Sequence, residues 1–206
     1  KWQIISADFS AIGEEIRKIG VQKVDGILAD LGVSSWQLDQ AERGFSYGQD
    51  GPLDMRMDQN SSLTAEKLVN ESSENELSRI ISEYGEERFA RLIAKSIVKH
   101  RTQKRITRTS ELADIIRGAM PGSALREKQH PARRTFQALR IAVNGELSSL
   151  EKLLADAPAL LSQGGRICII TFHSLEDRMV KEAFRNWEKP CTCPRSFPVC
   201  VCGKQP

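Results

Sequence analysis

The sequence lacks the patterns that mark several classes of protein. It has no run of eighteen apolar residues and no signal-peptide pattern, which argues against a membrane span or secretion. It has no P-loop and no G-x-G-x-x-G motif, so this chain by itself shows no phosphate-cradling turn. Neither Ser34 nor Ser174 lies in a G-x-S-x-G elbow, which argues against a serine hydrolase. We therefore expect a cytoplasmic protein.

Charge is unevenly distributed along the 206 residues, although the net charge is only +3. Residues 1–87 carry 8 Lys and Arg against 17 Asp and Glu, whereas residues 88–140 carry 14 against 3, an excess of +11. Residues 141–206 are nearly balanced, with 8 against 7. A basic block of this kind is either a solvated face or a binding surface for a polyanion such as a nucleic acid.

The N-terminal part has the pattern of a β-α-β unit. Residues 2–5 and Val24–Leu31 are expected to be strands, and a helix over about residues 11–19 is expected between them. Such units pair their strands in parallel, and the second strand is apolar enough to be buried on both faces. Asp30 lies at the end of this second strand, and ligands of open α/β sheets bind beyond the carboxyl ends of the strands. Asp30 is therefore a candidate site residue, unless it only caps a turn.

A second apolar strand is predicted over Arg166–Phe172, with Cys168 in the core. His173 and Ser174 follow it directly and precede a last helix. If both strands belong to one parallel sheet, these two residues share an edge with Asp30. A lone histidine is more often a structural hydrogen-bonding group than a catalytic one, but its place at a strand end favours the two interpretations equally, and both stay open.

The middle of the chain, residues 58–131, has helical periodicity and no strand pattern, which predicts an inserted helical domain. The expected apolar stripes of its three helices are Leu77, Ile80, Ile81 and Tyr84, then Phe89, Leu92, Ile93 and Ile97, then Leu112, Ile115, Ile116 and Ala119. Between the last two lies a basic segment whose charges are expected to be exposed, and its candidate nucleic-acid contacts are Lys99, Arg101, Lys104 and Arg105. From Arg133 one helix is predicted as far as about Leu161.

Four of the five cysteines form two Cys-x-Cys pairs near the end of the chain: Cys191, Cys193, Cys200 and Cys202. Four thiolates this close in sequence are one way to close a tetrahedral zinc site, although C-x-C spacing is less usual than C-x-x-C. The alternatives are a reduced flexible tail and oxidation among neighbouring thiols. A structural zinc ion is thus one hypothesis for this segment.

Seven blocks of sequence, in this order, resemble the RsmH (MraW) family. They are Asp30–Ser35, Gln37–Asp39, Ala41–Ser46, Gly51–Asp58, Tyr84–Phe89, Arg134–Ile141 and Phe172–Arg178. The resemblance runs from about Phe9 to Arg178, and seven blocks in one order are more specific than any single motif. It implies a bacterial S-adenosylmethionine-dependent methyltransferase that modifies the exocyclic N4 of a cytidine in the decoding region of 16S ribosomal RNA.

The same resemblance implies an α/β fold: a partial Rossmann-like methyltransferase sheet with an inserted all-helical domain. By position in the motifs, Phe9, Asp30 and Gln37 look like the cofactor contacts, and the basic block looks like the part that holds RNA. We expect Asp30, His173 and Ser174 to form the catalytic pocket, because a flipped cytosine needs walls that orient its amine.

The expected domain ranges are 1–57 and 132–190 for the methyltransferase sheet, 58–131 for the insertion and 191–206 for a Cys-rich tail. Family members carry a glycine-rich turn and an acidic, ribose-binding strand end upstream of the first residue here, so we interpret the chain as N-terminally incomplete. The family's C-terminal part also looks cut at Pro206, and the Cys-x-Cys tail resembles one found in only some members. The alternative is a non-catalytic RNA-binding or ribosome-assembly module that lacks the cofactor half.

Overall fold

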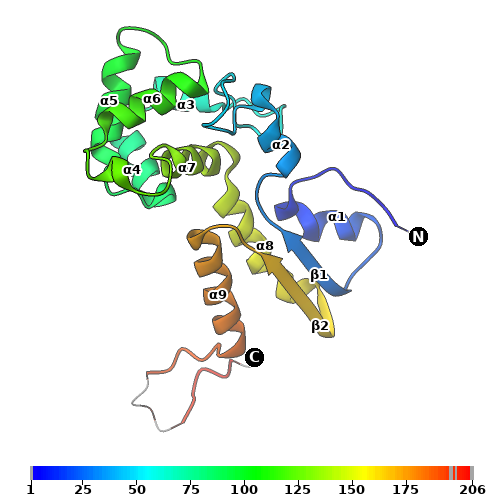
Figure 1. Cartoon of the computed structure of the whole chain (residues 1–206). Helices are drawn as coiled ribbons and strands as arrows, with labels where there is room; N and C mark the ends of the chain where they lie inside the picture. Colours follow the sequence, from blue (N-terminus) through cyan, green and yellow to red (C-terminus); the bar gives the residue numbers. More distant parts are fainter. Residues whose placement is uncertain (1, 195–196, 198, 205–206) are drawn as a thin grey trace. The chain divides into compact units, whose positions relative to one another are not determined.

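The computed structural model describes residues 2–194, 197 and 199–204, and it divides into two compact units (Figure 1). The first, which we call the strand unit, comprises Lys1–Gly32 and Leu147–Pro206. The second, the helical unit, comprises Val33–Glu146. In the described residues, no helix is long and apolar enough to cross a membrane.

The strand unit contains a parallel pair of strands, β1 (Val24–Asp30) and β2 (Leu161–Ile170). Their register runs from Gly26 opposite Arg166 to Asp30 opposite Ile170. Beyond this pair, Leu31 N–H donates to Ile170 O at 3.2 Å. The predicted parallel pairing is therefore confirmed.

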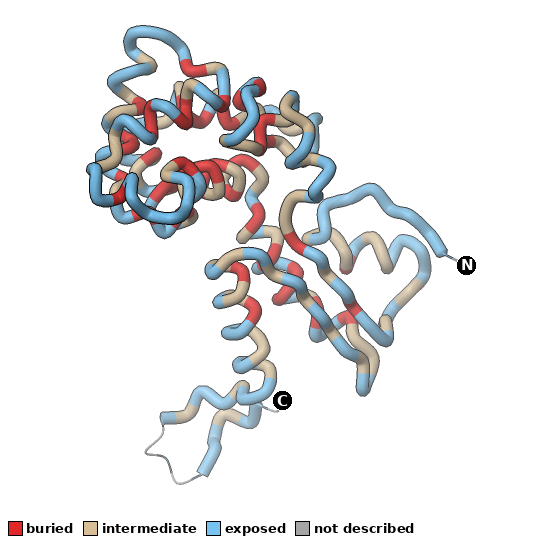
Figure 2. The backbone as a smooth tube through the Cα atoms, viewed as in Figure 1, coloured by how far each residue is buried: buried red, intermediate tan, exposed pale blue. Residues whose placement is uncertain are grey.

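Three helices pack on one face of this pair: α1 (Ile12–Lys18), α8 (Glu146–Leu160) and α9 (Ser174–Glu188). The core beneath them gathers Ile27, Ala157 and Leu160, with Ile16 and Trp187 packed against it. Figure 2 shows buried positions on α8 and α9 and exposed positions alternating along the strands. This alternation follows from the period of two in a strand with one covered face.

The other face of the strand pair is exposed, which corrects the prediction of strands buried on both sides. Leu28 is 73% exposed, and Cys168, its partner in register, is exposed rather than in the core. Among the described residues, all three packed helices lie on the opposite face, so these apolar side chains have no cover. The expected strand at residues 2–5 is also wrong: this segment is exposed and forms no strand.

The described residues of the helical unit form helices and loops, and neither β1 nor β2 lies in it. Its helices are α2 (Ser35–Asp39), α3 (Ala65–Glu71), α4 (Glu74–Gly85), α5 (Ala90–Arg101), α6 (Thr109–Ala119) and α7 (Arg133–Asn144), with short 3₁₀ turns at Ala41–Arg43 and Ala124–Arg126. Helix α4 packs against α5 and α7, and α5 packs against α6. The three predicted apolar stripes pack in the core as expected: most members are buried, Tyr84, Phe89 and Ala119 are partly buried, and only Leu92 of these stripes is exposed.

This unit is wider than the range 58–131 expected for the insertion, because segments on both sides join its core. Phe45, Leu53 and Met55 enter it from the loop before α3, and Phe136 and Leu139 enter it from α7. The loop is tightly packed: a Cβ on Gly51 would lie 1.7 Å from Ala41 O. Several residues of the sequence blocks 41–46 and 51–58 therefore serve to pack this loop.

The single helix predicted from Arg133 to Leu161 is two helices. Gly145, with φ +60°, ends α7 in the left-handed conformation, and α8 starts directly after it. Glycine adopts this conformation without strain, so it is a common residue just past a helix end. The apolar spacing runs through the break, which is why periodicity alone did not reveal it.

Candidate active site

The two strand ends of the strand unit lie at one edge of the sheet, as predicted. Asp30 is the last residue of β1 and stands opposite Ile170, the last residue of β2. The chain then passes through Phe172 to His173 and Ser174. The structure therefore brings Asp30 and the His173–Ser174 corner to the same edge.

The Asp30 carboxylate is exposed, and within the described residues no hydrogen bond or ion pair engages it. Its backbone is nevertheless fixed, because Leu31, the next residue, is buried in the core under α8 and α9. Gly32 then turns the chain with φ +86°, and a Cβ there would lie 3.6 Å from the Phe172 ring. A free carboxylate on a fixed backbone is suited to binding a ligand.

His173 is built into the start of α9. Its Nδ1 accepts from Glu176 N–H at 3.4 Å, and its Nε2 lies 3.2 Å from Glu176 Oε1. In return Glu176 Oε2 accepts from Phe172 N–H at 2.9 Å and from His173 N–H at 3.4 Å. Burial raises the pKa of the Glu176 carboxyl, but the His173 side chain and these N–H groups outweigh it and hold that pKa below its usual range. The His173 ring thus fixes the corner and leaves the adjacent Ser174 exposed at the helix start.

Phe9 lies in the 3₁₀ turn Phe9–Ala11 that leads into α1, and it is 37% exposed. Asp8 caps this turn by accepting from Ser10 N–H at 2.8 Å. Ile12 packs with Ala29 and Leu31 at the end of β1. The start of α1, which Phe9 precedes, is thereby packed against the core of the strand unit.

Gln37, the third predicted cofactor contact, belongs to the helical unit. Its Oε1 accepts from Ser34 N–H at 3.0 Å and from Ser34 Oγ at 3.2 Å, while Ser34 Oγ accepts from Gln37 N–H at 3.2 Å. This reciprocal capping box starts α2. The side-chain nitrogen of Gln37, Nε2, takes part in none of these bonds.

Three of the four predicted RNA contacts are engaged inside the helical unit. Arg101 Nη1 donates to Val69 O at 2.7 Å. Lys104 Nζ lies 3.2 Å from Glu111 Oε1. Arg105 pairs with Glu66 through Nε at 2.7 Å and with Glu71 through Nη2 at 3.2 Å. The charges of Lys104 and Arg105 are therefore partly neutralised by carboxylates of the protein itself, whereas Arg101 is held by a backbone carbonyl.

A basic stripe on α5 was not identified from the sequence. Arg91, Lys95 and Lys99 are exposed and spaced by four residues, so they lie along one side of the helix. Within the described residues no ion pair engages any of the three. The i, i+4, i+8 spacing was the available signal, and among the predicted contacts only Lys99 belongs to it.

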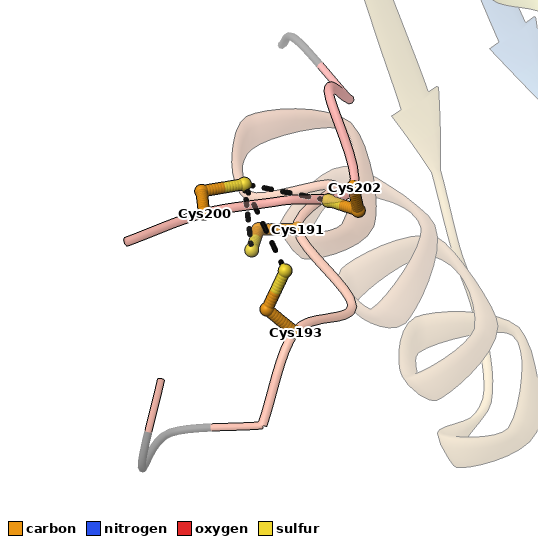
Figure 3. Close-up of side chains that lie close together, drawn as sticks. All are labelled: Cys191, Cys193, Cys200 and Cys202. Atoms are coloured by element: carbon orange, nitrogen blue, oxygen red, sulfur yellow. Dashed lines mark hydrogen bonds between the residues drawn. The ribbon is translucent and has the colours of Figure 1, made fainter. Parts of the chain in front are cut away.

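The four tail cysteines lie together after α9 (Figure 3). Cys200 Sγ is 3.5 Å from Cys191 Sγ, 3.9 Å from Cys193 Sγ and 3.5 Å from Cys202 Sγ. Backbone hydrogen bonds from Lys204 and Thr192 lower the pKa of the Cys202 thiol to about 6. The sequence showed the two pairs, and the structure adds that all four sulfur atoms converge.

With this geometry established, comparison with known proteins identifies the family. The model of the MraW methylase family matches residues 1–206. The chain belongs to the MraW methylase family. This confirms the resemblance inferred from the seven sequence blocks, and a mixed fold with a small parallel sheet fits the methyltransferases of this family.

Curated relatives in this family share the name ribosomal RNA small subunit methyltransferase H. The protein of Symbiobacterium thermophilum is 55% identical over 203 residues, which cover 98% of this chain and 64% of the relative. That of Clostridioides difficile is 53% identical over 203 residues, with 98% and 65% covered. That of Geobacter sp. (strain M21) is 56% identical over 204 residues, with 99% and 65% covered. The chain thus spans slightly less than two thirds of these relatives.

Proposed function

We propose that the chain is part of an S-adenosylmethionine-dependent methyltransferase that modifies the exocyclic N4 of a cytidine in the decoding region of 16S ribosomal RNA, in the bacterial cytoplasm. The observation that carries the proposal is the exposed, unpartnered Asp30 at the carboxyl edge of a parallel strand pair in a member of the MraW methylase family. The relatives' shared name supports the small-subunit RNA as substrate.

The residues at this edge fit the proposed cofactor. S-adenosylmethionine is cationic at its sulfonium and amino groups and carries an aromatic base, and when bound it supplies the methyl group. Asp30 offers an exposed carboxylate for a cationic or hydroxyl group, and Phe9 offers a partly exposed ring. Gly32, two residues after Asp30, has no side chain, so the space between its backbone and the Phe172 ring stays open. We propose Phe9 and Asp30 as its contacts on the strand unit, and we propose Gln37 as a contact from its position in the family motif alone.

The chain's contribution to the reaction is to position the cytosine amine. The N4 lone pair is delocalised into the ring, so hydrogen-bond acceptors that hold the amine in line with the methyl group lower the barrier. In this proposal Asp30 accepts such a hydrogen bond and takes up the proton that N4 loses. Ser174 forms a polar wall of the pocket, and His173, held by Glu176, is a positioning residue for that wall.

The helical unit is the part that we propose to be inserted into a Rossmann-like sheet and to hold the RNA. Its α5 stripe of Arg91, Lys95 and Lys99 presents three cations without protein partners among the described residues. Such a row of charges suits a phosphate backbone, which carries most of the affinity in RNA binding. Lys99, Lys104 and Arg108 also line a groove of about 860 Å³ on this unit.

The second candidate is a non-catalytic RNA-binding or assembly module. The internally paired Arg101, Lys104 and Arg105 reduce the charge available for it, but the α5 stripe would serve it equally well. The two functions differ in whether the Asp30 edge transfers a methyl group.

The experiment uses the protein produced from its complete gene, with any residues encoded before and after this chain. Small ribosomal subunits from a strain without the enzyme are incubated with the protein and methyl-labelled S-adenosylmethionine, and the RNA is digested to nucleosides. Label in N4-methylcytidine supports the proposal. Label in another nucleoside overturns the proposed target atom, and RNA binding without label supports the second candidate.

A further inference from the structure

The arrangement of the four tail sulfurs has the dimensions of a metal site. With metal–sulfur bonds of about 2.3 Å, tetrahedral zinc thiolate geometry sets the sulfurs about 3.8 Å apart. The three distances from Cys200 Sγ are 3.5, 3.9 and 3.5 Å, and all four sulfurs lie within 4.8 Å of one another. In Figure 3 the side chains of both Cys-x-Cys pairs point to a common centre.

We propose that Cys191, Cys193, Cys200 and Cys202 bind one Zn²⁺ ion as a structural site. Four thiolates fill the four positions of tetrahedral zinc, which leaves none open for water or substrate. A cluster with two or more irons would separate the sulfurs bound to different irons beyond the observed spread, although S₄ ligation suits both kinds of metal. This inference goes beyond the methyltransferase function and does not rest on it.

The fold of the tail gives an independent reason for an ion. None of the described residues between Lys189 and Lys204 is buried, and none lies in a helix or strand. Its apolar side chains Val199 and Val201 are exposed, so hydrophobic packing does not hold the segment together. Zinc binding supplies folding free energy to small segments that lack a core.

The first cysteine pair follows closely after α9, and a hydrogen bond joins the second pair to it. Cys191 comes three residues after the end of α9, whose last turn continues through a bond of 2.8 Å from Lys189 N–H to Arg185 O. Val201 N–H, from the second pair, donates to Cys193 Sγ at 3.3 Å. Backbone donors to ligating groups orient them and are typical of the surroundings of metal ligands. The ion would therefore fasten residues 200–202 to the end of α9.

A disulfide is the competing outcome. It requires two sulfurs about 2.05 Å apart, and therefore one defined pair. Cys200 Sγ instead lies at similar distances from three other sulfurs. The arrangement favours one shared centre over any single bridge.

The test measures zinc in the 206-residue chain purified in reductant and supplied with Zn²⁺. We expect one zinc per chain, and less than about a tenth of that in Cys200→Ser, which removes the sulfur common to all three close distances. Cys168→Ser is the matched control, because Cys168 is exposed but lies on the strand face, and it should keep the full zinc content. Wild-type chain without bound zinc, or Cys200→Ser with unchanged zinc, overturns the proposal.

Two further measurements keep the proposal falsifiable if Cys200→Ser folds poorly. Cobalt(II) in place of zinc should give the visible absorption of tetrahedral cobalt thiolate in the wild-type chain. Removal of the ion by a chelator should speed amide exchange between residues 189 and 204 and leave α5 unchanged. A mass lower by two hydrogens per bridge, with no metal bound, would assign the cysteines to disulfides instead.

Discussion

Leu112 on α6 is fully buried in the helical unit, whereas Leu28 on β1 is 73% exposed in the strand unit. The same contrast holds for polar groups. In the helical unit the side chain of Asn144 donates a hydrogen bond to Met55 O at 2.8 Å and accepts one from Met57 N–H at 2.7 Å. The Asp30 carboxylate, by contrast, has no partner in the described residues. The comparison separates two kinds of group: Leu112 and Asn144 stabilise the helical unit, whereas the strand unit carries the unpartnered carboxylate that we propose as a ligand-binding group.

The largest expected effect comes from the unsatisfied carboxylate. Asp30→Asn keeps the shape but removes the charge and one acceptor, so methyl transfer by the protein from its complete gene should fall by roughly 100-fold or more. Asp25→Asn, at the opposite end of the same strand, is the control and should retain activity. Equal activity of both variants would remove Asp30 from the site.

The contrast between the two leucines is directly measurable. Leu112→Ala leaves a cavity and should lower the free energy of unfolding by about 2–5 kcal/mol. Leu28→Ala removes an already exposed side chain and should change it by less than about 0.5 kcal/mol. Denaturant unfolding of the chain measures both values, and a large effect of Leu28→Ala would mean that the open strand face is covered in solution.

A smaller effect is expected for RNA binding. Replacing Arg91, Lys95 and Lys99 with Ala should reduce the magnitude of the slope of log affinity against log salt by about 2. Each phosphate contact releases counterions from the RNA, so the loss of three contacts makes binding less dependent on salt. Replacing Arg101, Lys104 and Arg105 removes the same charge from groups that already have protein partners, so the slope should change less. Binding titrations at several salt concentrations compare the two triple variants, and the reverse order would assign RNA binding to Arg101, Lys104 and Arg105 instead of the α5 stripe.

The smallest effect concerns acid stability of the helical unit. Hydrogen bonds from Arg108 and Ser110 lower the pKa of Asp50 from 3.8 to about 2. Because the folded state favours the ionised form, Asp50 contributes stability above pH 4, and this contribution is lost as the pH falls from about 4 to about 2. Asp50→Asn should therefore flatten the decline of the melting temperature over that range. Parallel declines in both proteins would show that Asp50 contributes nothing.

Local pattern and strand order predicted much of this fold. The acid at the end of an apolar strand located Asp30, and the parallel pairing confirmed its shared edge with His173. The apolar composition of β2 predicted a buried strand but not which residues would cover it, and Cys168 was misplaced for that reason. Gly145 was missed because the apolar spacing continues through the break.

Side-chain partners were the least predictable part of the site. The His173 ring caps α9 together with the Glu176 side chain, which folds back to the N–H groups before the helix. The pairing of Arg105 depends on carboxylates 34 and 39 residues away. Charge counting located the basic block, but only the structure separates its paired charges from the α5 stripe.

The most direct test of the central claim is amide exchange in the protein from its complete gene, with and without S-adenosylmethionine. If the Asp30 edge binds the cofactor, exchange should slow in residues 29–33 and 171–176, while α4 and α6 in the helical unit stay unchanged. Cofactor binding detected by calorimetry together with slower exchange only in the helical unit would contradict the assignment of chemistry to the strand unit.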